Sequence, residues 1–154
     1  MEIQSELMRS PQHMAVKQFS IFADNKVGRL NDIVLMLSSK DINIMALTTI
    51  DTTDSSIVRI IVDYWQEARE LLRSQNIQFS LSEVVVAELD NPQTIKQITC
   101  SMLQAEINIH YIYPMLVRPG EKYALVMRVE DNEMATEILN SNGIRTLLHT
   151  DIAR

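Results

Sequence analysis

An internal repeat constrains this chain more than any other feature. The tripeptide Ile-Asn-Ile at residues 42–44 recurs at residues 107–109, which is 65 residues further on. The same offset places the apolar positions of residues 30–37 on those of residues 95–102. The helical stripe at residues 68–72 then falls on residues 135–139, at an offset of 67. A repeat of this kind indicates two copies of one supersecondary unit.

Each half has the pattern strand, helix, strand, strand, helix, strand. Alternating or β-branched apolar residues predict strands at 16–23, 42–51, 56–62 and 77–81, and then at 83–89, 107–115, 123–129 and 144–149. Apolar residues at helical spacing predict helices at 28–40, after Asp63, from Pro92, and at 133–141. Asp63 and Gln66 have the spacing of a capping box. Asn76 and Gly143 can end their helices in the left-handed conformation.

The link between the halves, around residues 80–82, is very short. Two modules joined in this way must lie side by side, because such a link cannot separate them. We therefore expect an N-terminal extension at 1–15, a first module at 16–81 and a second module at 82–154.

The strand at residues 123–129 (YALVMRV) is apolar on both faces. Helices cover only one face of a sheet of this kind, so a second copy of the protein is the simple candidate to cover the other face. The alternative is an open face that carries a few scattered apolar residues.

Composition excludes several classes of partner. The formal net charge is −6 and the pI is about 5.0, which disfavours nucleic acids and anionic membranes, since both are bound through basic surfaces. No apolar run is long enough to span a bilayer, and residues 1–13 lack the apolar core of a signal peptide. Cys100 is the single cysteine, which excludes an intramolecular disulfide and fits a reducing compartment. We expect a soluble, cytoplasmic protein.

Catalytic and metal-binding patterns are missing from the sequence. None of the common nucleophile, phosphate-loop, dinucleotide or zinc-protease motifs occurs. His13, His110 and His149 do not have ligand spacing, and no cysteine pair supports them. We predict no catalytic residues, no metal and no cofactor.

The segment from Asp24 to Leu30 is the strongest candidate for a binding site. A turn between a strand and a helix exposes backbone N–H groups and the positive end of the helix dipole, where a carboxylate binds readily. Gly28 would let a ligand approach the backbone, although a glycine in such a turn is often structural. The amides of Asn25 and Asn43 could both donate and accept hydrogen bonds, which suits a zwitterion.

Residues 19–47 resemble the opening of an ACT domain, which has a strand, a turn N-x-P-G-x-L, a helix and a strand that begins N-I. The turn here is Asn25-Lys26-Val27-Gly28-Arg29-Leu30, with Val27 in place of the usual proline. The following strand begins with Asn43-Ile44. Residues 108–113 (NIHYIY) resemble the N-I-x-Y-x-Y run of free-standing tandem ACT proteins. The resemblance covers residues 16–150.

The resemblance implies an α+β fold: two tandem ferredoxin-like βαββαβ modules side by side, in an antiparallel eight-stranded sheet with four helices on one face. It also implies amino-acid sites at the seam between modules. The first site would use the turn residues Asn25, Lys26, Val27, Gly28, Arg29 and Leu30 with the strand residues Asn108, Ile109 and His110. The reciprocal site would use Asn91, Pro92, Gln93, Thr94 and Ile95 with Asn43 and Ile44. Because Gln93 stands where the family has glycine, we expect this second turn to be degenerate.

These features predict a non-catalytic regulatory protein that binds a small molecule, most simply an amino acid. With no output domain in the sequence, regulation would act through a protein partner or through a homodimer. The alternative is a structural or oligomerisation module whose ligand site has been lost.

Overall fold

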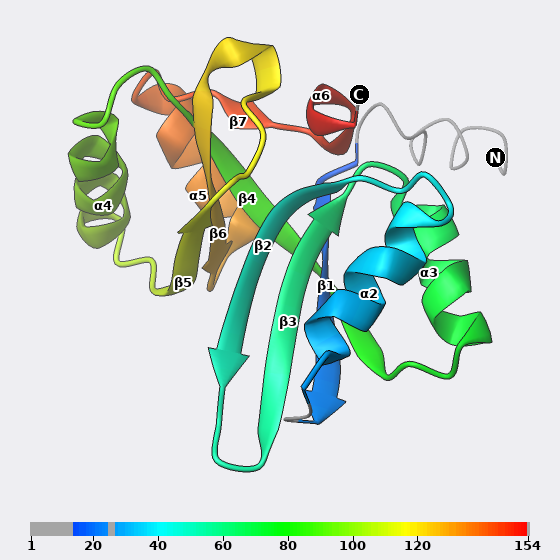
Figure 1. The fold of residues 1–154 in the computed structure, drawn as a ribbon. Coiled ribbons are helices and arrows are strands. Elements are labelled where there is room, and N and C mark those ends of the chain that lie inside the picture. Colours follow the sequence, from blue (N-terminus) through cyan, green and yellow to red (C-terminus); the bar gives the residue numbers. More distant parts are fainter. Residues whose placement is uncertain (1–13, 25–26, 154) are drawn as a thin grey trace, which may run out of the picture. The chain divides into compact units, whose positions relative to one another are not determined.

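The computed structural model describes residues 14–24 and 27–153, which form two compact units. The first module is Lys17–Ser82, and the second is Glu83–Ile152 together with residues 14–16 (Figure 1). Most of the predicted N-terminal extension, residues 1–13, lies outside the described residues.

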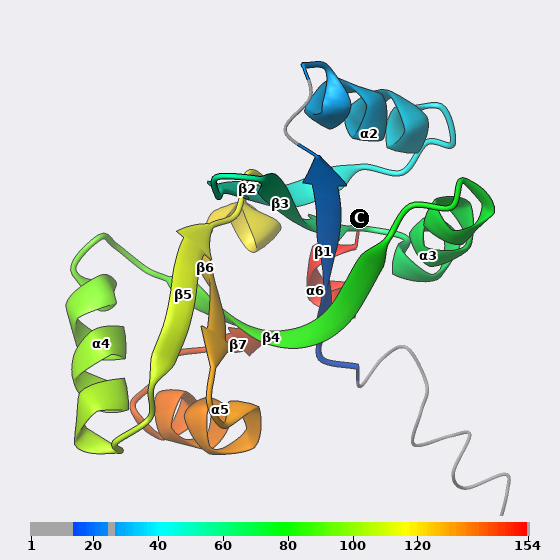
Figure 2. The ribbon, with the colours of Figure 1, turned by 90° about the horizontal axis from the view of Figure 1, so that it is seen from below.

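The first module has the predicted order of elements. These are β1 (Val16–Asp24), α2 (Arg29–Ser38), β2 (Ile44–Asp51), β3 (Ser55–Val62), α3 (Trp65–Ser74) and the beginning of β4 (Phe79–Leu89). The strands lie in the order β2-β3-β1-β4, as expected for a ferredoxin-like module. Helices α2 and α3 lie on one face of this sheet (Figure 2).

The register of the central strands explains the core of the first module. Phe19 lies opposite Ile60 and Ile21 lies opposite Val58, so all four side chains share one face. All four are buried. Ile21 lines one hollow with Ile33 of α2, which identifies this face as the one that the helix covers.

The second module repeats the pattern. It comprises the remainder of β4, then α4 (Thr94–Gln104), β5 (Ile109–Pro114), η2 (Pro119–Glu121), β6 (Tyr123–Val129), α5 (Asn132–Ser141), β7 (Thr146–Leu147) and α6 (His149–Ile152). The strand order is β5-β6-β4-β7. One buried cluster joins the sheet to α4 and α5, and includes Ile98, Met102, Met127 and Leu139.

The repeat is visible in the backbone at the helix ends. A residue with positive φ follows each of four helices. These residues are Asp41 after α2 (φ 55°), Asn76 after α3 (56°), Glu106 after α4 (56°) and Gly143 after α5 (78°). The next residue in each case donates its N–H to a carbonyl five residues back, over 2.9–3.1 Å. Four helices therefore end in the same hydrogen-bonded turn. The left-handed conformations predicted for Asn76 and Gly143 are confirmed.

The prediction of eight strands is wrong, because residues 14–24 and 27–153 form seven. The strands expected at 77–81 and 83–89 form one continuous strand, β4. Residues 80–82 contain serine but no glycine or proline, so nothing in the backbone prevents them from continuing the ladder. Backbone pairing with neighbouring strands outweighs the weak strand preference of serine.

The last predicted strand, at 144–149, is also too long. Only Thr146–Leu147 pairs with β4, and the chain then turns into α6. The Asp151 carboxylate accepts a 2.7 Å hydrogen bond from the Leu148 N–H. This bond starts the helical turn and removes Leu148 from the ladder.

The second face of β6 carries buried apolar residues. Ala124 is 3% exposed and Val126 is 0% exposed. Val126 lies opposite both Val86 and Tyr113, which are buried as well. The homodimer stays a prediction.

Candidate functional site

The first strand–helix turn has an open helix start. Gly28 is the N-cap of α2, at φ 89° and ψ −4°, and no side chain caps the helix there. The first N–H groups of a helix have no acceptor within it. Those of Gly28, Arg29, Leu30 and Asn31 are consequently positioned to bind an anionic group. The predicted residues Asn25 and Lys26 lie outside the described residues.

Gly28 is required by its backbone conformation and not by crowding. An added Cβ would meet nothing within 4 Å, but φ of +89° is a conformation that other residues rarely adopt. A side chain at this position would push the turn toward another conformation and redirect its N–H groups.

A hollow of about 730 Å³ lies beside this turn, and we call it the Gly28 hollow. Its volume suits a small ligand. It brings together four of the predicted site residues, Val27, Gly28, Arg29 and Leu30. Its other lining residues come from α2 and three strands: Ala23, Asp24, Asn31, Val34, Thr49, Asp51, Ser56 and Val58.

Thr49 and Asp51 of β2 were missed by the sequence analysis. They lie at the end of β2, whereas the predicted Asn43 and Ile44 lie at its beginning, about 20 Å away for a strand of this length. The hollow therefore combines apolar walls with carboxylates from two strands and one guanidinium. The alternation of β2 fixes which residues share a face, but only the position of α2 shows which end of the strand lines the hollow.

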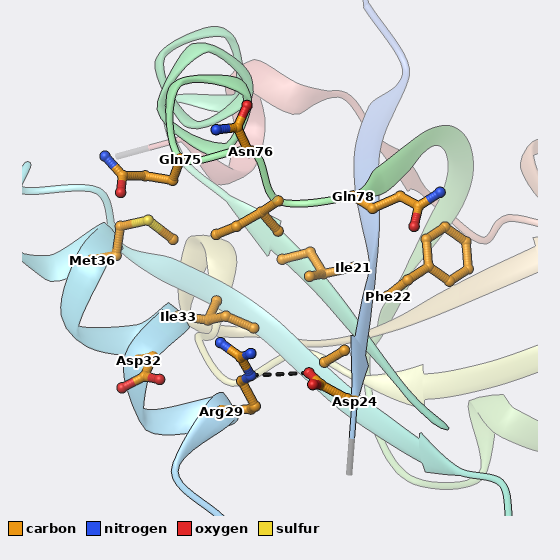
Figure 3. Close-up of a pocket in the computed structure, with 12 residues that line it drawn as sticks. Ile21, Phe22, Asp24, Arg29, Asp32, Ile33, Met36, Gln75, Asn76 and Gln78 are labelled. Carbon is orange, nitrogen blue, oxygen red and sulfur yellow. Dashed lines mark hydrogen bonds and ion pairs between the residues drawn. The ribbon is translucent and has the colours of Figure 1, made fainter. Parts of the chain in front are cut away.

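Asp24 and Arg29 form an ion pair across the turn. Arg29 Nε donates to Asp24 Oδ1 over 3.0 Å, and each side chain is 48% exposed (Figure 3). A pair this exposed contributes at most about 1 kcal/mol to stability. Its effect is instead to fix the position of a cation at the edge of the Gly28 hollow.

Asn43 has a structural partner in Asp63, and its place in a ligand site stays a prediction. Its Nδ2 donates to Asp63 Oδ2 and its backbone N–H donates to Asp63 Oδ1, both over 2.9 Å. Asp63 Oδ1 also accepts from the Tyr64 N–H over 2.9 Å. The predicted capping box of Asp63 and Gln66 is wrong, because the N-cap of α3 is Tyr64 and no side chain caps it. Asp63 instead ties β3 to the start of β2.

Asn108, Ile109 and His110 lie at the start of the second module's edge strand. Asn108 and His110 are exposed, while Ile109 packs partly against the core. The Asn108 carbonyl accepts from the Glu130 N–H over 3.0 Å. Their grouping with the first turn stays a prediction.

The second strand–helix turn is closed by its own residues. Asn91 Oδ1 accepts from the Gln93 N–H over 3.0 Å, and the Asn91 carbonyl accepts from the Thr94 N–H over 3.1 Å. Gln93 has right-handed helical angles, φ −70° and ψ −18°. These N–H groups already have acceptors, which makes the turn a poor place for a ligand carboxylate.

The structure also bears on metal binding and on insertion into a membrane. Among residues 14–24 and 27–153, no three His, Cys, Asp or Glu side chains gather where they could hold a metal ion. None of the helices in those ranges is long and apolar enough to cross a membrane.

Residues 14–154 match the family model of the ACT domain pair. The chain therefore belongs to the ACT domain pair family. No curated protein gives a significant sequence match.

Solved structures agree with this fold. A crystal structure of a protein from Bacteroides thetaiotaomicron is 25% identical, with a TM-score of 0.82, and the alignment covers 92% of this chain and 97% of that one. The ligand-free regulatory subunit of aspartate kinase from Thermus thermophilus is 15% identical, with a TM-score of 0.60 and coverage of 83% and 92%. The corresponding subunit from Thermus flavus is 14% identical, with a TM-score of 0.56 and coverage of 83% and 92%.

Proposed function

We propose that this protein is a non-catalytic regulatory protein that binds an amino acid at the Gly28 hollow. The observation that carries the proposal is the uncapped start of α2 behind a left-handed Gly28, at the edge of a hollow with mixed apolar and charged walls. Membership of the ACT domain pair family supports a regulatory role. The Thermus thermophilus structure, which shares the fold, is itself a regulatory subunit.

The lining of the hollow suits a zwitterion. The N–H groups at the start of α2 attract the ligand carboxylate, aided by the helix dipole. Asp51, at the end of β2, offers a carboxylate to the ammonium group, while Val34 and Leu30 offer apolar contact to the side chain. Asn108, Ile109 and His110 remain the proposed wall contributed by an ACT module beside the turn.

Regulation would follow from differential affinity. A ligand that binds one packing of ACT modules more tightly than another shifts the population toward that packing. The same reasoning applies whether the modules belong to one chain, to a homodimer or to a complex with a target protein.

A thermal-shift panel of the common amino acids tests the proposal. A ligand at 100 times its Kd should raise the free energy of unfolding by about 2.7 kcal/mol. If no amino acid in the panel stabilises the protein, the result would instead support the alternative, a structural or oligomerisation module. That alternative is favoured by the second turn, whose N–H groups Asn91 already occupies.

Gly28→Ala provides the site-specific test, with Gly143→Ala as its matched control. Both glycines have positive φ and open surroundings, so each substitution should cost about 1–2 kcal/mol of stability. Only Gly28→Ala should also weaken amino-acid binding, by about tenfold or more as measured by isothermal titration. Equal affinities for the two variants would exclude the Gly28 hollow as the binding site.

A further inference from the structure

A second hollow borders α2, and Figure 3 shows the residues that line it. We call it the Met36 hollow; its volume is about 620 Å³. It is formed by α2, the end of β1 and the segment that joins α3 to β4. Asp24 and Arg29 line both hollows, so their ion pair stands between the two. Both hollows lie within the first module.

The Met36 hollow has an apolar floor and a polar rim. Ile21 and Ile33 are buried at its floor, and Met36 and Ile77 are half-buried beside them. The amides of Gln75, Asn76 and Gln78 lie along the rim and are exposed. Aliphatic floors with a few polar groups at the edge are typical of sites for small molecules.

Arg29 presents a cation to this hollow. Its Nε is hydrogen-bonded to Asp24. Among the described residues this is the only partner of its side chain, which leaves the two terminal nitrogens free to donate. Figure 3 shows the guanidinium directed into the hollow toward Ile33. A guanidinium held by one edge can still accept a carboxylate on its other edge.

Asp32 places an anion next to that cation. It follows Arg29 by three residues on the same helix, and side chains at this spacing are neighbours on the helix surface, about 5–6 Å apart at Cβ. With Asp24 neutralised by Arg29, Asp32 is the remaining charge in the lining. A cationic site and an anionic site therefore flank one apolar floor.

We propose that the Met36 hollow is a second small-molecule site, which takes a zwitterionic amino acid with an aliphatic or thioether side chain. The ligand carboxylate binds the terminal nitrogens of Arg29, and its ammonium group lies against Asp32. Its side chain covers Ile21, Ile33, Met36 and Ile77. A simple anion is disfavoured because two carboxylates line the hollow. The proposal is separate from the Gly28 hollow. The two hollows share the class of ligand and the residue Arg29, but Ile21, Asp32, Ile33, Met36 and Ile77 line only the Met36 hollow.

L-Leucine is the probe for the test, titrated into the ¹⁵N-labelled full chain while backbone amide shifts are recorded. Saturable shifts are expected at Asp32, Gln75 and Asn76, which line only the Met36 hollow. L-Leucinamide lacks the carboxylate and 4-methylpentanoate lacks the ammonium group. Each should bind about fivefold or more weakly than L-leucine.

Two matched variants separate the hollows. Asp32 lines only the Met36 hollow and Asp51 lines only the Gly28 hollow, and both are exposed. Asp32→Asn should raise the Kd measured at Gln75 and Asn76 about fivefold. Asp51→Asn should leave it unchanged, since distant sites act independently.

Three results would overturn the proposal. The first is the absence of saturable shifts at Asp32, Gln75 and Asn76 when L-leucine is added. The second is that Asp51→Asn weakens L-leucine binding as much as Asp32→Asn does, and the third is that either analogue binds as tightly as L-leucine. The proposed function is judged separately, by shifts at Gly28 and Asn31 and by their sensitivity to Asp51→Asn. A lack of binding at one hollow is in this way distinguishable from a lack of binding at the other.

Discussion

Replacing Asp63 by alanine is expected to lower the free energy of unfolding by about 3 kcal/mol. The Asp63 residue is 4% exposed, and its carboxylate accepts hydrogen bonds from the Asn43 N–H, the Asn43 amide and the Tyr64 N–H, each over 2.9 Å. Alanine would leave three donors without this acceptor, at about 1 kcal/mol each. Urea unfolding followed by far-UV circular dichroism measures the loss.

Asp131→Ala is the matched control for Asp63→Ala. Asp131 caps α5 in the second module through one hydrogen bond, to the Met134 N–H over 3.0 Å. Loss of such a cap costs about 1 kcal/mol. If Asp63→Ala were no more destabilising than Asp131→Ala, the Asp63–Asn43 contact would not have the structural role assigned to it.

Asp63 also shows where reasoning from sequence reaches its limit. The spacing of Asp63 and Gln66 is that of a capping box, yet the carboxylate binds Asn43, which is 20 residues away along the chain. A local pattern cannot reveal a partner that only the pairing of β2 with β3 brings close. For the same reason, the sequence did not reveal Asp63 as a partner of Asn43.

Local signals correctly predicted how two of the helices, α3 and α5, end. Asn76 and Gly143 are residues that tolerate positive φ, and both adopt it. Asp41 and Glu106 adopt it as well, at equivalent places in the repeat. Aspartate adopts positive φ less often than glycine, and glutamate does so rarely. The turn after α2, α4 and α5 places the next apolar residue, Ile42, Ile107 or Ile144, in the core, and its burial outweighs the backbone strain. After α3 the equivalent residue, Ile77, is half-buried.

The site was predictable only in part. Gly28 and its neighbours could be predicted as a binding turn, because a glycine between a strand and a helix is recognisable from the neighbouring sequence alone. The sequence did not predict the role of Thr49 and Asp51 or the existence of the Met36 hollow, because each depends on segments that are distant in sequence. The Met36 hollow needs β1, α2 and the segment after α3 together, and its aliphatic residues fit an ordinary core pattern equally well.

Replacing Leu139 by alanine should cost about 3 kcal/mol of unfolding free energy, within the range seen for a buried leucine. Leu139 is 0% exposed in the cluster that joins α5 to the sheet. The truncation removes apolar contacts and leaves a cavity that the neighbouring Ile98 and Met127 cannot fill without moving. Chemical denaturation followed by circular dichroism measures the effect.

Leu103→Ala is the same substitution on the solvent side of the same module. Leu103 is 77% exposed on α4, so its truncation should change stability by no more than about 0.5 kcal/mol. Leu72 is the equivalent of Leu139 in the first module: it is fully buried, and its carbonyl accepts the same helix-ending hydrogen bond. If the two modules are built alike, Leu72→Ala should match Leu139→Ala within about 1 kcal/mol, and a loss as small as that of Leu103→Ala would contradict the assignment of these helices to the core.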